Sequence, residues 1–194
     1  MERWIFIPPN VLWTSYTAWF VMEWWIISRD MRRFRGRTAD RGSFFGFFIA
    51  IPGALIIAFS AVIHLPQFRI VAPQPWLSWL GIGMIWAGLA FRGWAVVTLG
   101  AFFRTSVVVQ EGHQLVTAGP YRWLRHPAYT GVIITVTGLG LALGNGVSLL
   151  AMAILPTLAI AFRVAVEERA LGETFGEAYA SFCKSRSAVI PVIW

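Results

Sequence analysis

The sequence predicts an all-α membrane protein, a bundle of five transmembrane helices with a polar site at the cytoplasmic interface. Hydrophobic residues make up 57% of the 194 residues and charged residues only 13%, whereas soluble domains carry about 25% charged residues. The apolar residues gather in runs that approach or reach the roughly 17 to 25 residues needed to cross a bilayer. A polar, cationic stretch at 119–129 separates two of these runs.

Three of the predicted spans lie in the first half of the chain, at about 11–28, 43–63 and 76–99. The loop after the first span holds six arginines. Such a loop marks the cytoplasmic side, so we expect the N-terminus outside and the 64–75 connection on the outer face. The net charge of +7 does not favour a nucleic-acid partner, because most of the arginines border apolar runs, where they set topology and meet anionic membrane lipids.

The second half begins with 100–125, which is too polar to cross lipid and is expected to lie at the cytoplasmic interface. Two apolar runs follow, 128–143 and 147–166, and the Gly144-Asn145-Gly146 turn signal predicts that they form an antiparallel hairpin. The C-terminus is then cytoplasmic, with an amphipathic helix over 167–185. We expect one compact domain, made of a three-helix N-terminal part (1–99) and a part that carries the candidate site (100–194).

Two charged residues interrupt predicted spans, Glu23 in the first and Arg92 in the third. Ionisable groups inside a bilayer are costly and usually face the protein interior in pairs. Both residues are expected near the cytoplasmic ends of their helices. The sequence therefore predicts that they pair or that each reaches the interface, and a contact with substrate stays open.

The candidate site is centred on the stretch from Gly119 to Tyr129. Pro127 is well tolerated in a first helical turn, so Arg125 and His126 should sit just before a helix that starts near Ala128. Such a helix start presents free N–H groups and a partial positive charge to any anion beside it.

Two acidic residues at the end of the last span should face the same interface. Arg163 and Glu167 lie one helical turn apart on one face, and Glu168 points about 100° away from Glu167. One carboxylate could therefore bind a ligand diol or amine while the other pairs with an arginine. The candidates for that pair are Arg122, Arg125 and Arg169.

Other kinds of site are less well supported. His64 is expected on the opposite side of the membrane from the other two histidines, and a zinc site needs three or four convergent ligands, so no metal is predicted. The chain has no Gly-x-Ser-x-Gly turn for a serine nucleophile and no Gly-x-Gly-x-x-Gly or phosphate loop.

A set of motifs in the second half of the chain occurs in a fixed order, namely 112–121 and 125–131, followed by Arg163, Glu167, Glu168, Leu171, Phe175, Gly176, Tyr179, Arg186 and Pro191. This pattern resembles the isoprenylcysteine carboxyl methyltransferase family, and phospholipid methyltransferases share the same C-terminal pattern. The resemblance implies an enzyme that binds S-adenosylmethionine without a Rossmann domain and methylates a membrane-embedded lipophilic acceptor. It also implies cofactor contacts from Gln110, His113, Gln114, Leu115, Val116, Tyr121, His126, Pro127, Ala128, Tyr129 and Glu167.

The same resemblance implies that Arg163 faces the acceptor. A carboxylate acceptor of the isoprenylcysteine type is already anionic and needs only to be placed in line with the methyl group. A phospholipid amine, a hydroxyl or a thiol would need a general base, for which His126 and Glu168 are the candidates. Two further alternatives are an NADPH-dependent enzyme similar to membrane sterol reductases and a non-catalytic membrane module with the same fold.

Overall fold

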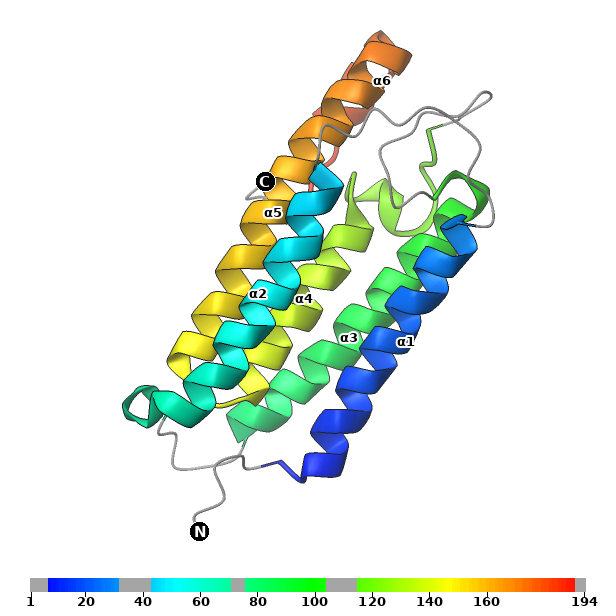
Figure 1. The fold of residues 1–194 in the computed structure, drawn as a ribbon. Coiled ribbons are helices and arrows are strands. Elements are labelled where there is room, and N and C mark those ends of the chain that lie inside the picture. The colour runs from blue at the N-terminus through cyan, green and yellow to red at the C-terminus, as the bar shows by residue number, and fades with distance from the viewer. Residues whose placement is uncertain (1–6, 32–42, 71–75, 104–114, 191–194) are drawn as a thin grey trace.

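The computed structural model describes residues 7–31, 43–70, 76–103 and 115–190. Helices make up most of this described part of the chain (Figure 1). Apart from isolated backbone bridges, these residues contain no β-structure. The long helices are α1 (Pro9–Met31), α2 (Ser43–His64), α3 (Trp76–Leu99), α4 (Pro127–Ala142) and α5 (Gly146–Phe175), followed by the shorter α6 (Glu177–Lys184). Short 3₁₀ turns are η1 (Pro66–Phe68), η2 (Gly100–Phe102) and η3 (Gly119–Arg122).

The five apolar runs of the sequence correspond to the five long helices. The run at 76–99 matches α3 at both ends, and the other ends agree within a few residues, except that α5 continues beyond 166. The predicted helix over 167–185 is wrong, because α5 continues through this region to Phe175 and α6 begins separately at Glu177. The break falls at Gly176, whose φ of 52° is a conformation that glycine adopts without steric cost. Leaving an apolar environment does not by itself end the backbone hydrogen bonding of a helix.

The long helices lie side by side, and α6 extends beyond the end of α5 (Figure 1). The main packing pairs are α3 with α4, α2 with α5 and α4 with α5, while α1 packs against α3. The α4–α5 turn is at the opposite end of the bundle from α6. The start of α4 and the last turns of α5 are therefore at the same end, where the candidate site lies.

The turn between α4 and α5 is held by Asn145, which confirms the predicted hairpin. The Asn145 side-chain oxygen accepts hydrogen bonds from the backbone N–H groups of Val147 and Ser148 at 2.9 and 3.3 Å. Its amide donates to the carbonyls of Ala61 and Leu65 at 3.3 and 3.0 Å. One side chain thus caps α5 and joins the hairpin to the end of α2.

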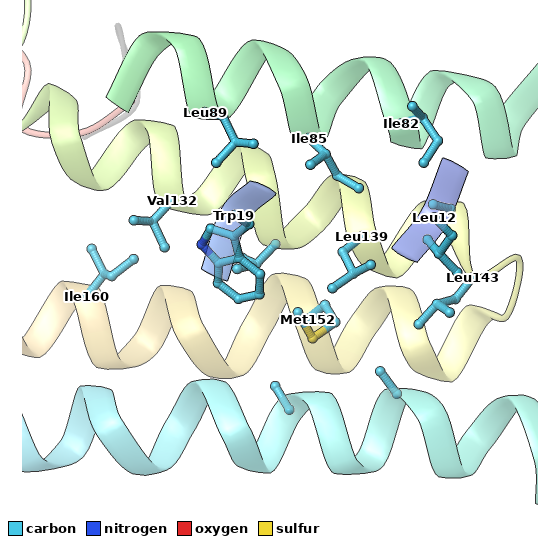
Figure 2. Packing of buried hydrophobic residues seen from close by; sticks show 14 of the residues in the cluster. Leu12, Trp19, Ile82, Ile85, Leu89, Val132, Leu139, Leu143, Met152 and Ile160 are labelled. Carbon is cyan, nitrogen blue, oxygen red and sulfur yellow. The ribbon is translucent and has the colours of Figure 1, made fainter. Parts of the chain in front are cut away.

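The interior of the bundle is apolar, and so is much of its outer face. Figure 2 shows Ile85, Leu139 and Met152 converging from α3, α4 and α5, with Trp19 of α1 reaching the same core. Tryptophan, isoleucine, leucine and phenylalanine side chains are exposed on the outer faces of α1, α2, α3 and α5. Among the described residues, α3 and α5 are long and apolar enough to cross a membrane, and shorter apolar helices cover Ile49–His64 and Pro127–Ala142. These exposed apolar faces suit an environment of lipid.

Helices α3 and α4 approach each other closely because glycines face each other across their contact. A Cβ atom added at Gly81 would lie 2.5 Å from the backbone nitrogen of Ala142 and 2.6 Å from the carbonyl oxygen of Gly138. A Cβ added at Gly131 would lie 2.8 Å from the backbone nitrogen of Arg92. Backbone therefore touches backbone along this contact, as small residues allow in membrane helices.

We expect Gly81→Ala to destabilise the protein, because the new methyl group would meet backbone atoms that cannot move without separating α3 from α4. Overpacking of this kind costs about 1–3 kcal/mol. Thermal unfolding in detergent should show a lower midpoint than for the wild-type protein. Gly83→Ala is the matched control, since a Cβ at Gly83 meets nothing within 4 Å. Equal midpoints for the two variants would contradict the proposed close contact.

Candidate functional site

The site is built at the start of α4, where Pro127 occupies the first turn as predicted and His126 precedes the helix. The backbone N–H groups of Arg125 and His126 donate to the carbonyls of Ser187 and Ala188, both at 2.9 Å. The hydroxyl of Thr130 donates to the carbonyl of Val189 at 2.6 Å. The C-terminal stretch 187–189 therefore fixes the backbone that carries His126.

His126 lies between the two adjacent glutamates of α5. Its Nε2 is 3.2 Å from Glu168 Oε1, and its Nδ1 is 3.9 Å from Glu167 Oε2. The histidine side chain is buried, whereas those of Glu167 and Glu168 keep 30% and 27% of their exposure. A loop residue and two residues of the last long helix, some 40 positions apart in sequence, thus meet at one point.

Tyr129 joins Glu167 to Arg163. The Tyr129 hydroxyl donates to Glu167 Oε2 at 3.0 Å and accepts from Arg163 Nε at 2.7 Å. Arg163 is only 3% exposed, so its charge is held inside the protein by polar contacts. Arg163, Tyr129 and Glu167 form a continuous hydrogen-bonded row that begins in the interior and ends at a partly exposed carboxylate.

Glu168 is the glutamate that pairs with an arginine, and its partner is Arg125. Arg125 Nε donates to Glu168 Oε1 at 2.8 Å, and its Nη1 donates to the carbonyls of Cys183 and Arg186 at 3.3 and 3.0 Å. Of the other candidates, the Arg122 guanidinium stacks on the Trp123 ring at 4.0 Å. The two carboxylates therefore differ in their surroundings, as their angular separation on the helix predicts.

Arg186 connects the C-terminal stretch to the 3₁₀ turn η3, which contains Tyr121. Its Nε donates to the carbonyl of Tyr121 at 3.0 Å, and its guanidinium lies over the Phe182 ring at 4.3 Å.

Burial raises the pKa of the Tyr121 phenol, and the nearby negative charge of Glu167 raises it further. Burial likewise raises the pKa of Tyr179, with Glu168 adding to the effect. Both phenols are neutral at physiological pH and can serve only as apolar surfaces or neutral hydrogen-bonding groups.

The predicted pairing of Glu23 with Arg92 is confirmed. Arg92 Nη2 donates to Glu23 Oε2 at 2.7 Å, and Arg92 Nε lies 2.7 Å from Glu23 Oε1. Arg92 Nη1 also donates to the carbonyl of Ala128 at 3.1 Å, inside the first turn of α4. This last contact connects the ion pair to the candidate site.

The remaining predicted site residues fall into two groups. Val116 and Ala128 lie beside the site, since Val116 packs against a small buried cluster that contains Ala95, Tyr121 and Ala128. The described residues contain no group of three or more His, Cys, Asp or Glu side chains placed to hold a metal ion. Gln110, His113 and Gln114 lie outside the residues that the structure describes.

The sequence left the partner of Arg125 open and gave no sign of the C-terminal carbonyls at 187–189. Arg125 was only one of three possible partners for a glutamate, and nothing in the sequence distinguishes it from Arg122 and Arg169. The C-terminal contacts are made by backbone atoms, which every residue carries. No residue-type motif could have identified them.

Comparison with known proteins gives concordant matches. Residues 80–173 match the sequence model described as the isoprenylcysteine carboxyl methyltransferase (ICMT) family. Protein-S-isoprenylcysteine O-methyltransferase A of Arabidopsis thaliana is 35% identical over 120 residues, which cover 61% of this chain and 61% of that protein. A probable protein-S-isoprenylcysteine O-methyltransferase of Oryza sativa subsp. japonica is 29% identical over 144 residues, which cover 72% of this chain and 75% of that protein.

A solved structure matches as well. It is that of the eukaryotic intramembrane Ras methyltransferase ICMT, with a TM-score of 0.63 and 28% sequence identity, and the match covers 76% of this chain and 52% of that one. The chain spans about three fifths of the length of the Arabidopsis relatives. The family match, the relatives and the solved fold agree, and they support a relationship of this chain to the isoprenylcysteine carboxyl methyltransferase superfamily.

Proposed function

We propose that this chain is an integral membrane methyltransferase that moves a methyl group from S-adenosylmethionine to a lipophilic acceptor, a carboxylate of the isoprenylcysteine type. The observation that carries the proposal is the meeting of His126 with Glu167 and Glu168 at one end of the bundle. The names of the relatives support the reaction and the acceptor class.

The residues around Glu167 suit a donor with a positive charge. S-adenosylmethionine supplies a methyl group on a cationic sulfonium, and aromatic faces and carboxylates stabilise cations. Glu167 remains 30% exposed while one of its oxygens accepts from Tyr129, so its carboxylate is accessible to a ligand amine or diol. Tyr121, Tyr129 and the apolar side chains of Leu115, Val116, Pro127 and Ala128 would line the same cofactor site. The predicted contacts of Gln110, His113 and Gln114 belong to this proposal too.

Arg163 is the residue proposed to place the acceptor. A guanidinium can hold a carboxylate through two parallel hydrogen bonds, which fixes both its position and its plane. The Tyr129 hydroxyl accepts a hydrogen bond from Arg163 Nε, so the orientation of the guanidinium is set before the acceptor arrives. A carboxylate acceptor requires no proton removal. If an amine, hydroxyl or thiol were the acceptor, His126 and Glu168 would be the general-base candidates.

The proposed topology places all five long helices across the membrane, with the N-terminus outside and the site at the cytoplasmic surface. It is supported by the apolar character of α3 and α5 and by the exposed apolar faces of α1 and α2. The cofactor would enter from the cytoplasm, and the acceptor would arrive sideways from the bilayer. We propose that residues 1–99 form the supporting part and residues 100–194 the catalytic part of one domain.

Two measurements on the purified protein in detergent test the proposed function. Calorimetry should detect binding of S-adenosylhomocysteine and no binding of NADPH. Transfer of a labelled methyl group into a total membrane lipid extract, followed by mass spectrometry, should give a methyl ester product. Binding of NADPH alone would instead indicate a reductase. A labelled amine, ether or thioether would retain the methyltransferase and overturn the carboxylate acceptor.

A further inference from the structure

Glu23 lies outside the residues that match the family model, yet it is joined to the candidate site through Arg92. Both polar atoms of its carboxylate lie 2.7 Å from nitrogens of the Arg92 guanidinium. The Arg92 side chain is 6% exposed and that of Glu23 is 21% exposed. A buried arginine requires a charged or hydrogen-bonding partner, and Glu23 supplies one from α1.

Arg92 in turn contacts the first turn of α4. Its Nη1 donates to the carbonyl of Ala128, which lies between His126 and Tyr129 in sequence. Because Gly131 has no side chain, the α4 backbone approaches this part of α3 closely, and a Cβ there would lie 2.6 Å from Arg92 Cβ. A change in the orientation of the guanidinium would therefore act directly on the first turn of α4, which carries the site.

Arg92 also brings a positive charge near the place proposed for a cationic ligand. Ala128, whose carbonyl accepts a hydrogen bond from Arg92, belongs to the same small buried cluster as Tyr121, and the charges of Arg92 and Glu167 both act on that phenol. In an environment of low dielectric constant an uncompensated guanidinium would oppose the binding of a sulfonium and would attract Glu167. A carboxylate in contact with the guanidinium removes most of this effect.

We propose that Glu23 is a positioning residue for methyl transfer: it holds Arg92 against the first turn of α4 and neutralises its charge beside the cofactor site. The inference rests on the proposed function and adds to it a residue of α1. Through the contact of Arg92 with Ala128, α1 takes part in fixing the turn that carries His126, although its packing partner is α3.

Attachment of α1 alone does not account for this arrangement. The Ser15 hydroxyl accepts a hydrogen bond from Trp86 Nε1 at 3.1 Å, which joins α1 to α3 near the other end. Arg29 Nη2 donates to the carbonyl of Gly100 at 3.0 Å, at the end of α3. With these links in place, removal of the Glu23 charge should affect the site more than the packing of α1.

The test compares Glu23→Gln with Glu23→Asp in the full-length protein. We expect Glu23→Gln to weaken S-adenosylhomocysteine binding about tenfold and to raise the KM for S-adenosylmethionine more than that for the acceptor, because a small displacement in a site is costly. Glu23→Asp keeps the charge and should recover most of the affinity. Glu177→Gln, on the exposed start of α6, is the control and should bind like the wild-type protein. Unchanged binding by Glu23→Gln would overturn the inference.

A second variant covers the case in which Glu23→Gln does not fold because Arg92 is left buried without its carboxylate. The double variant Glu23→Leu/Arg92→Met removes both charges, and replacing a buried ion pair by apolar residues is often neutral or stabilising. We expect it to unfold near the wild-type temperature and still to bind S-adenosylhomocysteine at least about tenfold more weakly. Wild-type affinity in this variant would show that the pair is only structural. Failure of the wild-type protein itself to bind would instead reject the proposed function.

Discussion

Replacement of Glu167 by glutamine is expected to weaken S-adenosylhomocysteine binding by about 10- to 100-fold. The amide keeps the size of the side chain and an oxygen that can accept from Tyr129, whose hydroxyl is 3.0 Å from Glu167 Oε2 in the wild-type protein. What it loses is the negative charge on a group that is 30% exposed and accessible to a ligand. Hydrogen bonds to charged groups contribute about 1.5–3 kcal/mol, and about 1.4 kcal/mol corresponds to tenfold in affinity.

Calorimetry on the purified variant measures this effect, and Glu173→Gln is its matched control. Glu173 lies on the same helix, is exposed, and is further from His126. Its replacement removes the same charge from the protein without touching the site, so its affinity should be that of the wild type. Equal affinities for Glu167→Gln and the wild-type protein, with both variants folded, would reject the cofactor role of Glu167.

Much of the helical arrangement could be predicted because strong local sequence patterns mark most of the helix ends. Apolar runs, the arginine-rich loop and the Gly144-Asn145-Gly146 turn locate the ends of the five long helices within a few residues, except for the end of α5. The end of α5 was misplaced because the change from apolar to polar residues after Val166 marks a change of surroundings. The helix itself ends only where Gly176 adopts a positive φ.

Several residues that meet at the candidate site in the described part of the chain could be named from the sequence, but their contacts could not. The cost of a charge in lipid is a strong constraint, so pairing of Glu23 with Arg92 was one of the alternatives that the sequence offered, and the structure shows this pair. The choice of Arg125 as the partner of Glu168 depends on how α5 is rotated relative to the loop, which no local pattern specifies. The same holds for the contact of Arg92 with the carbonyl of Ala128.

The two adjacent glutamates could be named from the sequence, but only the structure distinguishes the role of each. Sequence places them about 100° apart on a helix and predicts that only one serves a ligand. In the structure Glu168 is held by Arg125 and Glu167 contacts Tyr129, which leaves Glu167 as the better candidate for the cofactor. The tyrosine also links Glu167 to Arg163, so cofactor and acceptor would be positioned by one hydrogen-bonded row.

This row leads to a prediction that separates the acceptor from the cofactor. Arg163→Met should lower kcat/KM for a carboxylate acceptor by about 100-fold or more, because removing one partner of a buried charged pair costs about 2–5 kcal/mol. Arg163→Lys should recover little of the activity, since an ammonium cannot reproduce the two parallel hydrogen bonds of a guanidinium. Affinity for S-adenosylhomocysteine should stay within about threefold of the wild-type value, because Glu167 keeps its charge.

Arg169→Met is the matched control for this experiment, because Arg169 is an exposed arginine on the same helix and its loss should leave kcat/KM unchanged. Rates with a prenylated cysteine acceptor and affinities for the cofactor product are measured on the same preparations. An equal loss of both quantities in Arg163→Met would mean that Arg163 holds the cofactor. Full activity in that variant would mean that the acceptor carboxylate is placed elsewhere. Only a loss of acceptor turnover with cofactor affinity retained fits a guanidinium that Tyr129 orients toward the acceptor.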